Sequence, residues 1–346
     1  YLKYFSELKD RKFVFYFHND PLTMSGSISV SERIFILKFC KKIIFNSEWT
    51  KNRFFSELSK FYYNSEKVEV IPQSTSRAKV NLSKKEKIIT FVGKLNKSKG
   101  YDLFGASILK ILNEFKDWNA LILGDEPRER ITFQHSRLKN LGYQPHDKVL
   151  NILKKSSISI SCARWDEPFG RSSLEASSRG CAVIISNRGG LPETITDGII
   201  LKKLTTIELY RSIKDLIVNK QKMKKIQKNS LKNFYLDNKF ISSKIDNYRN
   251  KLYSDIKIIK EKLKIIHITN FNERHNGRLF YNTGRRINNG ILKLGHTIQT
   301  LSDRDVVSRE RKVFDITGSK SLNSKLIDWL EILIQTLLFL GMQIRF

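Results

Sequence analysis

From residue 87 to about residue 200, short apolar runs alternate with segments whose apolar residues recur at helical spacing. Strands that alternate with helices form parallel sheets, because two parallel strands need a crossover connection. The alternation therefore predicts an α/β fold built on a doubly wound parallel sheet. The runs that we assign to strands are 87–92, 119–124, 158–162 and 182–186.

The stretch from Trp165 to Ala176 follows the third of these runs and leads into a helical segment that stops at Gly180. Loops of this kind lie at the carboxyl ends of parallel strands, where open α/β sheets bind ligands. Gly170 lets the backbone approach a ligand closely. The amides at 169–171 would lie at a helix N-terminus without intrahelical partners, and such a terminus favours an anion.

Two carboxylates flank this helix start. Glu167 lies in the loop, and Glu175 lies about two turns into the helix. Carboxylates beside an anion-binding terminus suit a ligand that carries both phosphates and hydroxyls, such as a nucleotide sugar. Spacing alone does not separate this interpretation from an ordinary solvated helix start with acidic capping charges.

The pattern Glu-Pro-Phe-Gly-x-x-x-x-Glu at residues 167–175 resembles that of retaining, two-lobed (GT-B) glycosyltransferases of the family 4 type, also called glycosyl transferases group 1. The resemblance extends over roughly residues 10–260 and implies two Rossmann-like lobes. It implies that Glu167 contacts the donor sugar and that Glu175 holds the nucleotide ribose. It also implies that the backbone of Phe169, Gly170 and Arg171 faces the sugar and phosphates.

Two lysines follow the first strand of the alternating region. Lys94 comes directly after Gly93, and Lys99 precedes Gly100. Their ammonium groups could neutralise a diphosphate, although composition alone would make them surface lysines. The family pattern is Gly-Arg-Leu followed by Lys-Gly, and it implies that Gly93 and both cations contact the donor. Lys94 replaces the usual Arg and loses its bidentate fork.

Further site residues come from other strand ends. His18 follows a strand predicted from Lys12 to Phe17. A lone histidine is most often a hydrogen-bonded turn residue, but the resemblance implies that His18 closes over the donor sugar from the N-terminal lobe. A short strand is predicted at 141–143, and the resemblance places the backbone of Gly142 and Tyr143 near the nucleotide base.

The remaining pattern predicts further elements. Ser47 is a candidate N-cap in a Ser-Glu turn that resembles the family's strand-to-helix turn. The Gly-Gly-x-Pro-Glu turn at 189–193 also resembles the family's and should shape a pocket wall. Helices are predicted at 31–42, 147–155, 205–218, 221–235 and 239–260, and strands at 43–45 and 68–71.

We expect three regions: a partial N-terminal, acceptor-side lobe at 1–82, a nucleotide-sugar lobe with a crossing helix at 83–260, and a segment at 261–346. That last segment resembles the start of another N-terminal lobe, with a strand at 263–269, a helix past Gly290 and a strand at 298–301. It is interpreted either as part of a tandem or mis-assembled gene, which we favour, or as a permuted lobe. Because Tyr1 starts within a helix-like segment, we expect the chain to be a fragment.

The net charge limits which classes of partner the protein can have, and the cysteine content indicates its compartment. Lys and Arg number 63 against 34 Asp and Glu, so the formal net charge is 63 − 34 = +29. Nucleic acid, an anionic membrane and phosphorylated ligands all suit this balance. The basic residues are spread along the chain and not clustered on one segment. The compositional bias of an AT-rich genome is an equally good explanation for part of this charge. Cys40, Cys162 and Cys181 lack metal or redox spacing, and we expect no secretory signal. We expect a cytoplasmic protein with peripheral contact at the inner membrane face.

The expected function is transfer of a sugar from a UDP- or GDP-linked donor to a glycan or lipid-linked acceptor with retention, in polysaccharide biosynthesis. No metal or cofactor is expected, because cations can neutralise the leaving diphosphate. Alternatives are a GT-B-type epimerase or phosphorylase, an inactive nucleotide-sugar-binding fragment and, less favoured, a nucleic-acid binder. Asp303-Arg-Asp305 is interpreted as a loop, and 326–346 as an interfacial or partner-packing helix.

Overall fold

The structure is a computed structural model that describes residues 13–59, 66–129, 131–252, 262–268 and 282–301. The chain divides into two compact units, Tyr1–Ser254 and Asp255–Phe346. Among the residues that the structure describes, two parallel sheets belong to the first unit and one belongs to the second. The three-region division at 82/83 and 260/261 stays a prediction. Among the described residues, no helix is both long and apolar enough to cross a bilayer.

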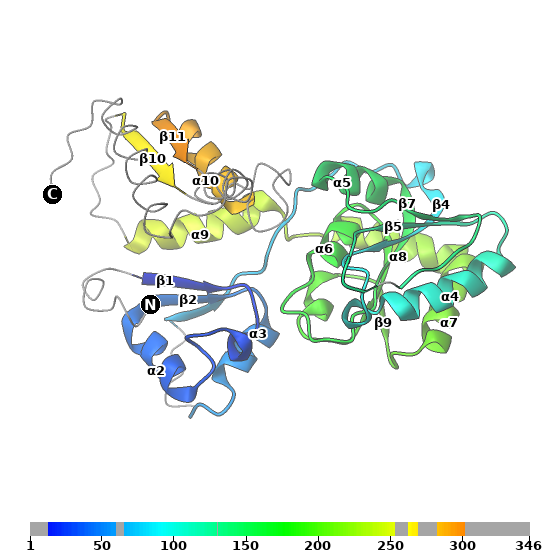
Figure 1. Ribbon diagram of the computed structural model, residues 1–346, viewed down its shortest axis with the longest axis horizontal. Coiled ribbons are helices and arrows are strands. Elements are labelled where there is room, and N and C mark those ends of the chain that lie inside the picture. The colour runs from blue at the N-terminus through cyan, green and yellow to red at the C-terminus, as the bar shows by residue number, and fades with distance from the viewer. Residues whose placement is uncertain (1–12, 60–65, 130, 253–261, 269–281, 302–346) are drawn as a thin grey trace, which may run out of the picture. The chain divides into compact units, whose positions relative to one another are not determined.

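The first sheet, which we call the N-lobe sheet, has the strand order β1-β2-β3 with all neighbours parallel (Figure 1). Its aromatic core stacks Phe17 on Phe45 at 5.3 Å between ring centroids, with Phe54 5.2 Å from each. We call residues 13–71 the N-lobe. Its elements are β1 (Phe13–Phe17), α2 (Val30–Phe39), β2 (Cys40–Phe45), α3 (Glu48–Phe55) and β3 (Val68–Val70).

The second sheet lies in residues 86–232, which we call the C-lobe. Its six described strands are ordered β6-β5-β4-β7-β8-β9, and every neighbouring pair is parallel. The strand order reverses between β4 and β7, so the predicted doubly wound sheet is confirmed. The strands are β4 (Glu86–Val92), β5 (Asn119–Leu123), β6 (Leu138–Asn140), β7 (Ser156–Ser161), β8 (Ala182–Ser186) and β9 (Ile199–Leu201).

Helices cover both faces of the C-lobe sheet, which explains why its strands are apolar on both sides. On one face Phe91 packs against Phe104 of α4 at 5.1 Å between centroids, and α7 joins the same cluster. On the other face Val183 and Ile185 pack with α5 and α6. The helices are α4 (Tyr101–Glu114), α5 (His146–Lys155), α6 (Arg171–Ser178), α7 (Thr206–Val218) and α8 (Lys220–Lys232).

Two segments of the chain cross between the lobes side by side. Residues 72–76 lead out of the N-lobe, and residues 234–237 lead into α9 (Asn238–Leu252). Thr75 forms a parallel bridge with Asp237, and its N–H donates to Leu236 O at 3.2 Å. An apolar cluster from both lobes surrounds this crossing, made of Ile44, Ile71, Phe169, Leu174, Phe234, Leu236 and Ile241.

The second unit contains a parallel pair of strands and one described helix. These are β10 (Lys264–Ile268), α10 (Asn282–Lys293) and β11 (Thr297–Leu301). The predicted strand–helix–strand order is therefore confirmed. Whether it begins another lobe stays a prediction. The interpretations of 303–305 and 326–346 lie outside the described residues.

Three predicted elements were wrong or missed. The helix predicted to Lys42 ends at Phe39, and β2 begins at Cys40. Lys42 is buried in a strand because its ammonium pairs with Glu69 at 3.0 Å, an arrangement that hydropathy does not indicate. The strand predicted at 141–143 lies three residues earlier: β6 ends at Asn140, and Gly142 has φ +63° with its N–H donating to Asn140 Oδ1 at 3.0 Å. Strand β9 was not predicted.

Candidate functional site

The candidate site lies where the strand order of the C-lobe sheet reverses. The loop after β4 carries Gly93, Lys94 and Lys99, and the loop after β7 carries Glu167. Because β4 and β7 are parallel neighbours, their carboxyl ends meet at the same edge of the sheet. Residues 68 positions apart in sequence are thereby brought together.

Lys99 and Glu167 form an ion pair in which the ammonium group donates to Oε1. Only 9% of Glu167 is exposed, so the lysine offsets much of the cost of burying the carboxylate. The Lys99 ammonium also lies 5.5 Å from the centroid of the Trp165 ring. Its backbone is fixed as well, since the Lys99 N–H donates to Asn96 Oδ1 at 3.0 Å. A cation and an acid are thus held next to one another at the strand ends.

Gly170 begins α6 in a conformation that favours glycine, with φ +108° and ψ +71°. A Cβ built there would lie 2.4 Å from Leu191 Cδ2, so a side chain would also collide. No side chain caps this helix start, while Ser173 Oγ donates to the Gly170 carbonyl at 2.8 Å. Because no side chain caps α6, a ligand could accept from its first amides, and that role stays a prediction.

Glu175 is 6% exposed and contacts one guanidinium group and one imidazole ring. Its Oε1 accepts from Arg171 Nη2 at 3.0 Å and lies 2.9 Å from His146 Nε2. For that second contact to be a hydrogen bond, His146 Nε2 must carry the proton. His146 is the site neighbour that sequence reasoning missed, because only the packing of α5 beside α6 brings residues 29 positions apart together. Its single sequence signal was its place at the start of a predicted helix.

His18 lies at the end of β1, on the N-lobe side. Its Nδ1 lies 3.0 Å from Gln73 Nε2, and its ring centroid lies 4.1 Å from that of Tyr16. Since the amide nitrogen of Gln73 can only donate, Nδ1 accepts and the proton of the neutral ring is on Nε2. Surrounding protein atoms desolvate the ring, and Arg171 adds a positive charge; both lower the pKa of His18. A neutral imidazole that offers an N–H donor is the result.

The other predicted site residues are less closely joined to this group. Lys94 is exposed and makes no ion pair within the described residues. Phe169 is 2% exposed in the cluster between the lobes, so only its backbone could contact a ligand. Tyr143 is 40% exposed beyond the end of β6. The roles of all these residues, together with those of Gly93 and Gly142, stay predictions.

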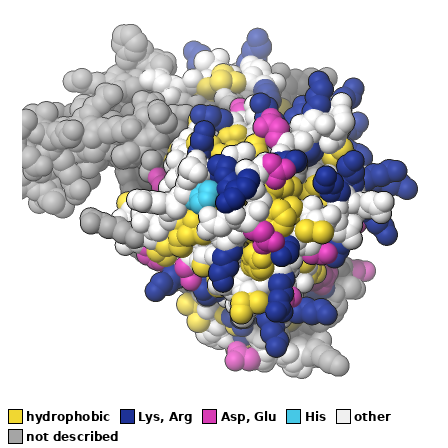
Figure 2. All heavy atoms as spheres, turned by 90° about the vertical axis from the view of Figure 1, so that its right-hand side faces the viewer, with side chains coloured by type: hydrophobic (Ala, Val, Ile, Leu, Met, Phe, Trp, Pro, Cys, Tyr) yellow, Lys and Arg dark blue, Asp and Glu magenta, His cyan; other side chains and the backbone are white. Residues whose placement is uncertain are grey.

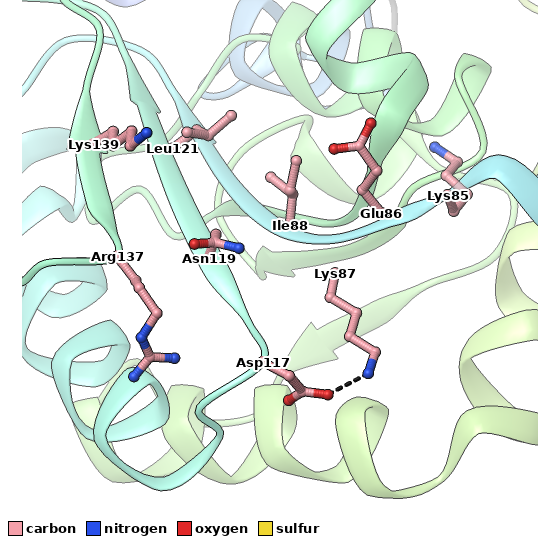
Figure 3. A pocket seen from close by; sticks show the side chains of 9 residues that line it. All are labelled: Lys85, Glu86, Lys87, Ile88, Asp117, Asn119, Leu121, Arg137 and Lys139. Atoms are coloured by element: carbon pink, nitrogen blue, oxygen red, sulfur yellow. Dashed lines mark hydrogen bonds and ion pairs between the residues drawn. The ribbon is translucent and has the colours of Figure 1, made fainter.

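A pocket of about 590 Å³ lies at the opposite edge of the sheet, at the amino ends of β4 and β5 (Figure 3). Two of its cations have partners within the protein. Lys87 pairs with Asp117, and the Arg137 guanidinium turns away from the centre and donates to the carbonyls of Phe115 at 2.8 Å and Trp118 at 3.0 Å. Ligands of doubly wound sheets bind at the carboxyl ends instead, so we assign no function to this pocket.

Residues 72–233 match the family model of glycosyl transferases group 1. This segment is a group 1 glycosyltransferase domain. The match contains β4 to β9 and both loops that form the ion pair between Lys99 and Glu167. The resemblance drawn from the Glu-Pro-Phe-Gly pattern is confirmed at the level of the family.

Curated relatives of the group 1 domain share about a quarter of its residues. The phosphatidylinositol N-acetylglucosaminyltransferase GPI3 subunit of Saccharomyces cerevisiae is 28% identical over 151 residues, which are 41% of this chain and 32% of the relative. Spore coat protein SA of Bacillus subtilis is 28% identical over 162 residues, which are 42% of this chain and 43% of the relative. The chain therefore spans less than half the length of these relatives.

Solved structures extend the similarity of fold beyond the group 1 domain. Anabaena Alr3699/HepE, crystallised with UDP-glucose, has a TM-score of 0.58 at 18% identity, covering 70% of this chain and 72% of that one. A glycosyltransferase from Rickettsia africae has a TM-score of 0.57 at 20% identity, with coverage of 72% and 73%. At these identities the likeness shows the fold alone.

Proposed function

We propose that this protein transfers a sugar from a nucleoside diphosphate donor to a glycan or lipid-linked glycan, with retention of the anomeric configuration. The observation that carries the proposal is the ion pair of Lys99 with Glu167 at the switch point of a group 1 domain. The Lys99 ammonium could bind a diphosphate at this position, and the Glu167 carboxylate beside it could accept hydrogen bonds from the sugar that the diphosphate carries.

In this proposal the positive groups stabilise the leaving diphosphate without a metal or cofactor. Lys99, assisted by Lys94 and the first amides of α6, would face the negative charge that develops as the bond from the anomeric carbon to the phosphate oxygen breaks. A new bond forms from the anomeric carbon to the acceptor oxygen. The acceptor proton passes to the leaving diphosphate, so no side chain has to serve as the only base.

The remaining groups orient the donor. Glu167 would accept hydrogen bonds from sugar hydroxyls, and Glu175 from the ribose hydroxyls through the oxygen that His146 and Arg171 leave available. His18 would donate from Nε2 to the sugar from the N-lobe side, which suits its lowered pKa and neutral state. The backbone of Gly142 and Tyr143 would lie near the base.

The donor class is narrowed by the names of related proteins. HepE is described with UDP-glucose, and the yeast relative is named as an N-acetylglucosaminyltransferase acting on phosphatidylinositol. We therefore propose a UDP-linked donor as the first to test and a GDP-linked donor as the second. A lipid-linked acceptor would bring the protein to the inner face of a membrane, while the protein itself stays cytoplasmic.

A thermal-shift experiment tests donor binding. We expect UDP or GDP to raise the unfolding temperature at millimolar concentration, because a ligand at about 100 times its Kd stabilises the native state by about 2.7 kcal/mol. UMP is the matched control, since it keeps the base and ribose but lacks the diphosphate that Lys99 should contact. Equal shifts with UMP, or none with either diphosphate, would contradict the proposal.

A turnover assay with the nucleotide sugars separates the alternatives. Release of nucleoside diphosphate that depends on an added acceptor indicates transfer, whereas an epimerase yields an isomerised donor. A phosphorylase requires inorganic phosphate or a sugar phosphate. Binding without any turnover indicates an inactive fragment.

Nucleic-acid binding is the least favoured alternative. The basic side chains on the face shown in Figure 2 are scattered among acidic and neutral ones and do not form one stripe. A nucleic-acid binder would lose affinity steeply with salt and would not respond to a nucleoside diphosphate. Competition between an oligonucleotide and UDP or GDP distinguishes the two.

A further inference from the structure

Two sequence motifs that lie outside the proposed donor contacts, one in each lobe, contact one another. The Glu193 carboxylate from the Gly-Gly-x-Pro-Glu turn of the C-lobe accepts two hydrogen bonds from the N-terminus of α3 in the N-lobe. Glu48 N–H donates to Oε2 at 2.7 Å, and Trp49 N–H donates to Oε1 at 3.0 Å. These amides belong to the first turn of α3 and have no intrahelical acceptor, so a carboxylate from the other lobe satisfies them.

A second contact joins the same helix start to the candidate site. Ser47, the N-cap of α3, accepts from Thr50 N–H at 3.0 Å and donates from Oγ to the Pro168 carbonyl at 2.6 Å. Pro168 directly follows Glu167. On the other side, the Gly190 N–H donates to the Glu167 carbonyl at 2.6 Å. The consecutive carbonyls of Glu167 and Pro168 therefore each accept a hydrogen bond from one of the two motifs.

The helix start is also connected to His18. The side-chain amide of Asn46, the residue before the N-cap, donates from Nδ2 to the His18 carbonyl at 3.0 Å. Its Oδ1 accepts from Thr50 Oγ1 at 2.8 Å, which fixes the amide orientation. A short series of hydrogen bonds thus runs from the end of β1 in the N-lobe to the loop after β7 in the C-lobe.

Burial raises the pKa of Glu193. The charged groups that face it are Glu48, which raises the pKa further, and Lys51, which lowers it together with the two amide hydrogen bonds. The hydrogen-bond partners of the Glu193 carboxylate are the two backbone N–H groups of α3, so both bonds are charge-assisted when the carboxylate is ionised.

We propose that Glu193 and Ser47 form a latch between the lobes that positions Glu167 and His18 relative to one another for sugar transfer. Both are positioning residues, because Ser47 acts through the Pro168 carbonyl and Glu193 through the amides of α3, and neither acts on a substrate. The inference rests on the proposed function for its effect on the rate, and on the described contacts alone for the existence of the latch.

Glu193→Ala and Ser47→Ala test the latch, with Glu193→Gln as the conservative variant and Glu208→Gln as the matched control. Glu208 lies in the first turn of α7, remote from the lobe contact, so its loss of charge is comparable. In Glu193→Ala we expect amide hydrogens in the first turn of α3 to exchange about 10-fold faster or more, because charge-assisted hydrogen bonds are lost. Glu193→Gln should fall between that variant and the native protein.

For the rate, we expect kcat to fall about 10- to 100-fold in Glu193→Ala, while Kd for the nucleoside diphosphate changes less than about twofold, because small displacements of reacting groups are costly. Ser47→Ala should lower kcat as well, and the double variant should lose less than the product of both losses. Unchanged exchange in α3, or equal losses of kcat and nucleotide affinity, would overturn the latch. Absence of turnover in the native protein would contradict the proposed function, and the exchange measurement would still decide the latch.

Discussion

At the scale of single residues, the ion pair of Lys99 with Glu167 joins two groups that we assign to different parts of the donor. A diphosphate would compete with Glu167 for the Lys99 ammonium, and the carboxylate would then be available to sugar hydroxyls. In the proposed function, the pair would therefore couple binding of the phosphate to orientation of the sugar. Lys94, which is exposed and outside this pair, has a weaker structural claim to the same task.

Replacing Lys99 should affect turnover more than replacing Lys94. We expect Lys99→Ala to lower kcat/KM by about 100-fold or more, the usual loss when one stabilising donor is removed from a developing oxyanion. Lys94→Ala should lose less than about tenfold, because an exposed cation without a fixed partner contributes little. Lys97→Ala, an exposed neighbour on the same loop, is the control. Steady-state kinetics decide, and equal losses at 94 and 99 would contradict this ranking.

Sequence indicates one of the contacts among the candidate site residues and not the others. The spacing of Arg171 and Glu175, four positions apart on one helix, indicates that they can meet. The contact of His146 with Glu175 and that of Glu193 with α3 span 29 and 145 positions, so they depend on tertiary packing. Periodicity within one segment carries no information about such pairs.

At the scale of elements, the carboxyl ends of β4 and β5 approach each other closely at two glycines. Gly124 has φ +146°, and a Cβ built on it would lie 1.8 Å from the Gly93 carbonyl oxygen. This approach places the loop that carries Lys94 and Lys99 directly beside the end of β5. Gly142 has φ +63° but no atom within 4 Å of its Cβ position.

Gly124 and Gly142 make a matched pair for a stability experiment, because both have a positive φ and only Gly124 lacks space for a Cβ. Gly124→Ala should destabilise the protein by at least about 2 kcal/mol, because it adds a collision with backbone to an unfavourable φ. Gly142→Ala should cost only about 1 kcal/mol, the left-handed conformation alone. Urea unfolding followed by circular dichroism measures both. A cost at 142 equal to that at 124 would show that the collision is relieved at no expense.

Most elements, though not the strand order, could be predicted from the sequence. The runs at 119–124 and 182–186 match β5 and β8 closely because these strands are apolar and bounded by turns. The three-residue strands β6 and β9 are too short to establish a period, which explains the misplaced and the missed strand. The order β6-β5-β4-β7-β8-β9 follows from packing across the whole sheet, and only resemblance could suggest it.

At the scale of the whole molecule, the formal charge of +29 predicts attraction to anionic surfaces. We expect the protein to co-sediment with vesicles that contain anionic phospholipid at low ionic strength and to dissociate as the Debye length falls from about 30 Å to about 8 Å. Vesicles of neutral phosphatidylcholine are the control. Failure to bind anionic vesicles at low salt would end the proposal of peripheral membrane contact.

The two chain segments that cross between the lobes near Thr75 and Asp237 limit how the lobes of the first unit can move relative to one another. A single connecting segment would let the lobes rotate relative to one another in every direction. Two adjacent connecting segments resist sliding of the lobes and leave rotation about the axis along the segments as the easiest motion. Arg179 of the C-lobe holds the segment 72–76 in place, because its guanidinium donates to Ser76 Oγ at 2.8 Å. The lobes would then open and close by rotating about this crossing. The amplitude of the rotation would be set by the backbone hydrogen bonds at Thr75 and Asp237 more than by the surfaces of the two lobes.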